Sequence, residues 1–233
     1  MKIAIIPARS GSKRIPNKNI KTFCGKPIIA YSIHAAISTG LFDEVIVSTD
    51  HSDIANIAVQ YGASVPFLRS NENSNDHATI LDVMHEVVSW YDSKGMSLEI
   101  CCGIYATAPF IRSEDLVKSY QKLVDEKRDS VLAIGKFPVP IQKAFKMNDG
   151  KISWFFDNFD LDRTQDLSSS YQDAAQFFWF NTAKFKRSGL IIGTNTGGYE
   201  IDQLAVQDID TQEDWEMAEF KYQFLKSRNE RGN

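Results

Sequence analysis

The first 42 residues contain no carboxylate, although the whole chain of 233 residues carries a formal net charge of −4. Seven Lys and Arg residues lie in that same segment. Nucleic-acid-binding domains are usually basic over their whole surface, so this charge balance argues against a nucleic-acid partner. The cations are instead concentrated in one segment, which predicts a local site for an anion.

Cysteine and long apolar runs are also scarce. Cys24, Cys101 and Cys102 are too few and too poorly spaced for a zinc site, and the adjacent pair is typical of buried thiols in a reducing compartment. The four His residues lack metal-ligand spacing. No stretch approaches the ~18 apolar residues of a membrane span, and the apolar start before Arg9 is too short for a signal peptide. We therefore expect a soluble, cytoplasmic protein with no membrane partner.

Apolar runs alternate with amphipathic segments along most of the chain. Strands are predicted at residues 3–7, 44–50, 64–68, 98–105, 130–136 and 177–180, and helices at 27–39, 52–61, 79–91, 113–125 and 212–227. This order predicts an α/β fold, Rossmann-like, with a mainly parallel sheet and helices on both faces. We expect residues 1–233 to form a single domain whose ligands lie at the carboxyl ends of the strands.

A cation-rich loop of small residues directly follows the first predicted strand. It places Ser10, Gly11 and Ser12 among the cations Arg9, Lys13, Arg14 and Lys18. Backbone N–H groups of such a loop converge on phosphate while Lys and Arg neutralise its charge. The loop therefore predicts a polyphosphate site; a solvated basic patch is the alternative.

Two carboxylates near the end of the chain give the second chemical signal. On an extended backbone Asp208 and Asp210 project to one side while Ile209 points to the core. Carboxylates held together repel unless a cation lies between them, which favours Mg²⁺. The alternative is that they only cap and solvate the last helix, which Thr211 and Asp214 are spaced to begin. Loop and pair together indicate metal-assisted nucleotide transfer.

The alternating pattern breaks at residues 137–176. Asn148-Asp149-Gly150 lies between two short apolar segments, which is typical of a β-hairpin turn. The segment is rich in aromatic residues, and such side chains are rarely left exposed. We predict an inserted hairpin that forms the dimerisation arm of a homodimer.

These motifs resemble those of the CMP-sugar synthetases that activate nine-carbon sialic-type acids. The family's opening motif is matched from Ala8 to Asn19 at every position except Ser10, where Gly is common, and its closing motif by Asp208 to Thr211. The resemblance implies transfer of CMP from CTP to a nonulosonic acid, with Mg²⁺ or Mn²⁺ as cofactor. It implies that the nucleotide is bound by Arg9, Ser10, Gly11, Ser12, Lys13, Lys18, Asn19 and Thr79. The catalytic set it implies is Lys13, Asp208 and Asp210, the two carboxylates holding the metal.

Within this family the chain is most similar to the branch that activates pseudaminic acid. Tyr105 stands where the sialic acid enzymes usually have Gln. The implied sugar-binding residues are Tyr105, Thr107, Gln142, Gln172, Asp173 and Gln176. N-acetylneuraminic acid and legionaminic acid remain alternative sugar substrates. Two other classes of protein also remain open: a sugar-1-phosphate uridylyltransferase and an inactive nucleotide-binding module.

Overall fold

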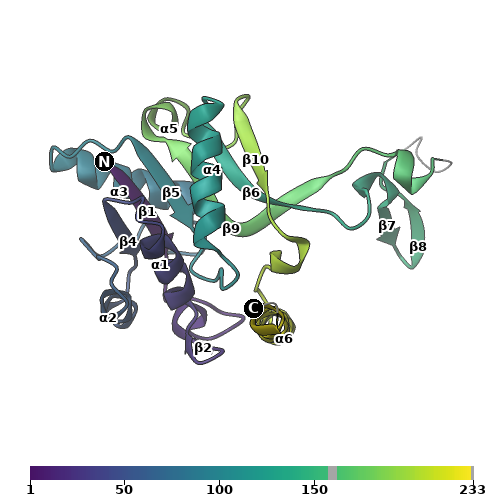
Figure 1. Cartoon of the computed structure of the whole chain (residues 1–233), viewed down its shortest axis with the longest axis horizontal. Helices are drawn as coiled ribbons and strands as arrows, with labels where there is room; N and C mark the ends of the chain where they lie inside the picture. Colours follow the sequence, from purple (N-terminus) through teal and green to yellow (C-terminus); the bar gives the residue numbers. More distant parts are fainter. Residues whose placement is uncertain (157–161, 232–233) are drawn as a thin grey trace.

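A six-stranded sheet forms the centre of the structure, a computed structural model that describes residues 1–156 and 162–231 (Figure 1). Its strand order is β10-β6-β9-β5-β1-β4. The strands are β1 (Lys2–Pro7), β4 (Glu44–Ser48), β5 (Ile100–Ile104), β6 (Ser130–Lys136), β9 (Tyr171–Asn181) and β10 (Thr196–Glu200). β9 pairs antiparallel with both β5 and β6, and the other pairings are parallel. The predicted α/β fold with a mainly parallel sheet is confirmed.

Helices cover both faces of this sheet because its strands alternate two sets of apolar side chains. Ala4 and Ile6 pack with α1 (Ile29–Ser38), α2 (Ser52–Gln60), α4 (Ser113–Asp125) and α6 (Gln212–Arg231). Ile3 and Ile5 point the other way and pack with α3 (Ile80–Ser93) and α5 (Thr182–Ser188). The alternation follows from the two-residue period of a strand.

Helix and strand boundaries agree with the sequence prediction to within a few residues, with two kinds of exception. The helix α5 and the edge strand β10 were not predicted, and β9 is longer than the predicted core strand. The predicted strand at 64–68 is present only as two isolated bridges, Ile46 to Ser64 and Thr49 to Leu68. Two further short strands, β2 (Thr22–Phe23) and β3 (Lys26–Pro27), pair beside α1, and 3₁₀ turns lie at Lys18–Ile20, Ile141–Lys143, Thr164–Asp166 and Gln203–Ala205.

A hairpin of β7 (Phe145–Asn148) and β8 (Lys151–Trp154) projects away from the sheet (Figure 1). Its two central residues, Asp149 and Gly150, have φ of 49° and 75°. Positive φ at both positions is what a tight hairpin turn requires, and the Asp-Gly pair supplies it. The role of this hairpin in a dimer stays a prediction.

The strand β9 carries a large irregularity where it passes the functional end of the sheet. Its register against β6 shifts between the pairs Leu132–Phe178 and Ile134–Asp173. Within this bulge Ala175 adopts a φ of 52°, which is uncommon for a residue with a Cβ. Bulges of this kind bend a strand and re-aim its side chains, and they are frequent beside active sites.

Candidate active site

The carboxyl ends of three neighbouring parallel strands meet at one edge of the sheet. β1 lies between β5 and β4, so the loops after Pro7, Ser48 and Ile104 are adjacent. A cavity of about 480 Å³ opens here and is lined by Pro7, by the loop at 9–14, by residues 69–83 and by Tyr105 to Thr107. This is where an open α/β sheet places its ligand.

The basic loop lines one part of the cavity, and the carboxylate of Asp76, from another loop, pairs with two of its cations. Arg9 Nη1 lies 2.9 Å from Asp76 Oδ1, and Lys13 Nζ lies 2.5 Å from Asp76 Oδ2. Arg9 also donates to the backbone oxygen of Asn75 at 3.0 Å. Hydrogen bonds from Lys13 and then Arg9 lower the pKa of the Asp76 carboxyl. Asp76 thus neutralises two cations that could also hold phosphate.

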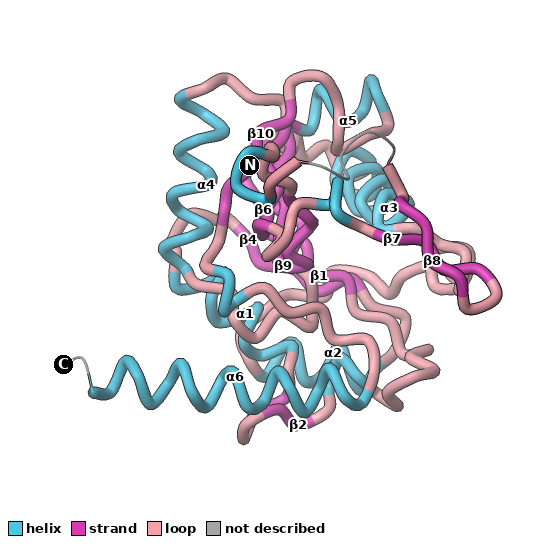
Figure 2. The backbone as a smooth tube through the Cα atoms, turned by 90° about the vertical axis from the view of Figure 1, so that its right-hand side faces the viewer, coloured by secondary structure: helices cyan, strands magenta, loops and turns pink. Residues whose placement is uncertain are grey.

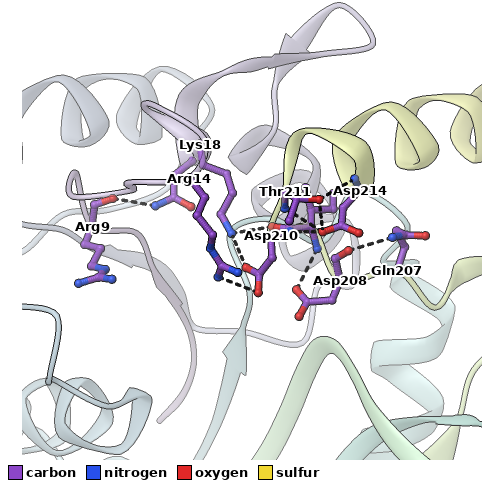
Figure 3. Close-up of polar contacts among 10 residues, drawn as sticks. Arg9, Arg14, Lys18, Gln207, Asp208, Asp210, Thr211 and Asp214 are labelled. Atoms are coloured by element: carbon purple, nitrogen blue, oxygen red, sulfur yellow. Dashed lines mark hydrogen bonds and ion pairs between the residues drawn. The ribbon is translucent and has the colours of Figure 1, made fainter. Parts of the chain in front are cut away.

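A second pair of cations reaches the opposite wall. Arg14 Nη2 lies 2.8 Å from Asp210 Oδ2, while Lys18 Nζ lies 3.2 Å from Asp210 Oδ1 and donates to the Ile209 oxygen at 2.6 Å (Figure 3). Asn19 Nδ2 donates to the Arg9 oxygen at 2.8 Å and fixes the start of the loop. The amino-terminal cations and the carboxyl-terminal acids, some 190 residues apart in sequence, therefore form one site.

The two predicted acidic residues, Asp208 and Asp210, are close enough for their negative charges to repel each other. Ile209 is fully buried, as the alternation required, and the side chains of Asp208 and Asp210 lie on either side of it in the chain (Figure 3). Asp210 lines the cavity, whereas the more exposed Asp208 lies outside its lining. Burial, and next the neighbouring Asp210 charge, raise the pKa of the Asp208 carboxyl. Asp214 instead accepts from Thr211 N–H at 2.8 Å and Asp210 N–H at 3.0 Å and begins α6. The capping alternative therefore explains Asp214 but not Asp208.

The donor set fits a single hard cation bound jointly with a ligand. Mg²⁺ usually takes one or two carboxylates and completes its shell with phosphate oxygens and water. A cation beside Asp208 would offset both the burial and the Asp210 repulsion that raise the pKa of its carboxyl. Within residues 1–156 and 162–231 no group of three or more His, Cys, Asp or Glu could hold a metal by itself. The pair would therefore need the ligand's own oxygens.

Asp208→Asn should raise the thermal stability of the metal-free protein at neutral pH. The folded pKa of Asp208 is raised, so its ionised form costs folding free energy above that pKa, and a neutral amide removes the cost. Thermal unfolding in EDTA should show the variant melting above wild type at pH 7. The difference should shrink as the pH falls through the raised pKa towards that of an ordinary Asp. A variant that melts lower at pH 7 would contradict this interpretation of the pair.

The structure brings most of the predicted residues to the cavity, but not all of them. Its lining includes the predicted residues Arg9, Gly11, Ser12, Lys13, Lys18, Asn19, Thr79, Tyr105, Thr107 and Asp210. Ser10 turns away, donating from its N–H and its hydroxyl to Asp50, each at 2.9 Å. Thr79 lines the cavity as the N-cap of α3, in a capping box with Asp82.

Three of the remaining sugar-site predictions, Gln172, Asp173 and Gln176, lie on β9 at or beside its bulge, and the fourth, Gln142, lies in the 3₁₀ turn Ile141–Lys143. The Tyr105 hydroxyl donates to Asp173 Oδ2 at 3.4 Å, and burial raises the pKa of Tyr105. Gln176 is buried and donates from Nε2 to the Ala205 oxygen at 2.8 Å, while its Oε1 has no hydrogen-bond partner among the described residues. Gln142, Gln172, Asp173 and Gln176 all lie outside the lining of the cavity.

The sequence analysis missed several residues of the cavity lining, among them Asn73, Asn75, Asp76 and the buried Arg69. Its side chain is buried, and it donates to both the hydroxyl and the backbone oxygen of Ser48. Burial lowers the pKa of this guanidinium, and the Asp50 and Glu86 charges oppose that shift. A buried cation at the floor of a cavity is unusual. The only signal in the sequence was an Arg at the end of the apolar segment 65–68.

The chain belongs to the cytidylyltransferase family, whose family model matches residues 3–213. Over 94% of its length it is 36% identical to pseudaminic acid cytidylyltransferase of Campylobacter jejuni, and the match covers 95% of that protein. It is 39% identical over 49% of its length to CMP-N,N'-diacetyllegionaminic acid synthase of Legionella pneumophila, covering 49% of that protein. The fold is similar to that of a CMP:2-keto-3-deoxy-manno-octonic acid synthetase complexed with CTP, with a TM-score of 0.68 at 17% identity, over 98% of this chain and 99% of the other.

Within the described part of the chain, no helix is both long and apolar enough to span a bilayer.

Proposed function

We propose that this protein transfers CMP from CTP to the anomeric hydroxyl of pseudaminic acid and releases pyrophosphate. The observation that carries the proposal is a loop with four cations at one end of the sheet, two of which pair with Asp76 and two with Asp210 of the Asp208–Asp210 pair. The negative charge of a nucleoside triphosphate complements the loop cations, and a divalent cation complements the two carboxylates. The full-length similarity to a pseudaminic acid cytidylyltransferase supports the choice of sugar.

The loop residues hold the triphosphate in this proposal. Arg9 and Lys13 exchange Asp76 for phosphate oxygens, because a polyanion competes for the same donors. Ser12 and Gly11 line the cavity beside them, where backbone N–H groups can approach the phosphates. Thr79 and Arg69 line the same cavity and are proposed to contact the nucleoside.

Asp208 and Asp210 hold the metal ion, Mg²⁺ or Mn²⁺, in the proposed mechanism. When bound, the ion offsets the charge that develops at the attacked phosphate. Arg14 and Lys18 keep the Asp210 carboxylate in place. The sugar's own hydroxyl is the attacking group, so no protein nucleophile is needed. In this proposal residues 1–233 form the single domain that carries out the reaction, and the reaction takes place in the cytoplasm.

Pseudaminic acid should be the fastest sugar substrate, by at least about tenfold, which corresponds to some 1.4 kcal/mol in the transition state. The partly buried Tyr105 beside Asp173 replaces an amide with an aromatic wall. An additional sugar hydroxyl against it would lose its water partners, at about 1–3 kcal/mol for each unpaired group. Pyrophosphate release should be compared for pseudaminic, legionaminic, N-acetylneuraminic and 3-deoxy-manno-octulosonic acids.

Legionaminic acid is the second candidate sugar, because of the 39% identity over half the chain to a legionaminic acid synthase. If legionaminic or N-acetylneuraminic acid matches pseudaminic acid in that comparison, the assigned sugar is wrong while the transfer reaction stands. Release with none of the four sugars would overturn the proposed reaction.

The hairpin is proposed to join two copies of the chain. Phe145, Met147, Ile152 and Trp154 share one face of it; Phe145 stacks on Trp154 at 4.3 Å, and Met147 and Ile152 are 71% and 65% exposed. Burying this face in a two-fold contact would remove it from water. Met147→Lys with Ile152→Lys should therefore lower the assembly mass measured by sedimentation.

Ser153→Lys is the matched control for the hairpin, because it adds a charge to the opposite face. Equal sedimentation of wild type, control and double variant would remove the hairpin from any subunit contact.

A further inference from the structure

The last helix has a second apolar face that the body of the protein does not cover. Trp215, Ala218 and Tyr222 face inward, where the Phe23 ring meets Trp215 at 5.4 Å and Tyr222 at 5.6 Å. Met217, Phe220 and Phe224 point the other way and are 50%, 68% and 50% exposed. Figure 2 shows that the C-terminal half of α6 runs past the other elements.

The exposed residues form one continuous stripe that ends in opposite charges. Glu213, Met217, Phe220, Phe224 and Arg228, here called the outer stripe, are spaced by three or four residues and so lie on one side of the helix. Glu213 and Arg228 have no hydrogen-bond or ion-pair partner within the described residues. The 4-3-4 spacing of the first four is that of a coiled-coil seam.

We propose that the outer stripe is a contact site for a second copy of this chain, with the two α6 helices antiparallel. Setting Met217 of one copy opposite Phe224 of the other also sets Glu213 opposite Arg228, because each charged residue lies four positions further out. Both ends then form ion pairs, and Phe220 lies near the two-fold axis. A parallel arrangement would instead place Glu213 against Glu213 and Arg228 against Arg228.

The charge distribution over the whole helix supports this choice of occupant. By sequence, the amino-terminal half carries Glu213, Asp214, Glu216 and Glu219 against one cation, Lys221, and the other half carries Lys226, Arg228 and Arg231 against one acid, Glu230. A helix with this gradient is complementary to its own antiparallel copy, and such a contact is isologous, as a two-fold axis requires. The contact is separate from the hairpin, so the two contacts together would build an assembly larger than a dimer.

Sedimentation of the full chain carrying Met147→Lys and Ile152→Lys tests the contact without any contribution from the hairpin. This parent should dimerise as its concentration rises to a few hundred micromolar. Adding Phe220→Glu should weaken dimerisation at least about tenfold, since two exposed aromatic rings would leave the contact. Circular dichroism should be unchanged, because Phe220 is mostly exposed. A parent that stays monomeric, or an unaffected Phe220→Glu variant, overturns the proposal.

Charge reversal then tests the antiparallel register in the same parent. Glu213→Arg and Arg228→Glu should each weaken dimerisation, by about fivefold, by setting like charges together. The two combined should restore it, while the exposed control Lys118→Glu on α4 should change nothing. If the combined variant dimerises no more tightly than either single variant, the proposed contact is contradicted. Rescue is expected only where Glu213 of one copy faces Arg228 of the other.

Discussion

Asp210→Asn is expected to fold normally and to lose two to four orders of magnitude in kcat/KM, roughly the range for removing a preorganised electrostatic group. Two interactions are lost together. A neutral amide is a poor ligand for Mg²⁺, and it leaves Arg14 and Lys18 without the carboxylate that both contact at 2.8 and 3.2 Å. Steady-state rates of pyrophosphate release, at saturating Mg²⁺ and pseudaminic acid, give the measurement.

Asp125→Asn is the matched control, since Asp125 is exposed at the far end of α4 and near the amino end of β6. Its kcat/KM should equal that of wild type. Asp208→Asn adds a finer comparison: it leaves the cation contacts intact, so its defect should include a higher Mg²⁺ concentration for half-maximal rate. Near wild-type turnover in both site variants would remove the pair from the mechanism.

Lys13→Ala should slow the reaction about 100-fold and weaken CTP binding about tenfold, because charge builds on the phosphates in the transition state. Lys13 is 80% exposed and, among the residues that the structure describes, pairs with Asp76 alone, so the fold should not change. CTP affinity by calorimetry and kcat by pyrophosphate release separate the two effects.

Lys26→Ala serves as the control for charge alone, since Lys26 is equally cationic, exposed, and outside the cavity that Lys13 lines. It should leave both affinity and kcat unchanged. If the two variants behave alike, the amino-terminal cations act only as a diffuse positive field and the loop has no specific role.

The sequence allowed the core of the fold and half of the site to be predicted because both depend on local patterns. Ile3 to Ile6 form the buried strand that their apolar run predicts, and the composition of the loop after it predicts a phosphate site. Ile209, an apolar residue between two acids, was likewise predicted from its neighbours to point into the core, where the structure places it. In each case neighbouring residues carry the information.

What the sequence could not give depends on contacts between distant segments. The reversed direction of β9 is set by its pairing with both β5 and β6, which no local period records. Arg69 joins the site only because the turn after Leu68 passes beside Ser48. The ion pairs of Arg9 and Lys13 with Asp76 cross more than sixty residues of sequence. The bulge at Ala175, beside the proposed sugar site, is likewise a product of sheet register.

One measurement tests the central claim most directly: incubation of the purified protein with CTP, Mg²⁺ and pseudaminic acid, followed by mass spectrometry of the nucleotide products and by phosphate analysis. CMP-pseudaminic acid and pyrophosphate should form in equal amounts, with no product when UTP replaces CTP or when EDTA is added. No CMP-sugar from any nonulosonic acid, or a uridylyl product from UTP and a sugar 1-phosphate, would contradict the proposed reaction.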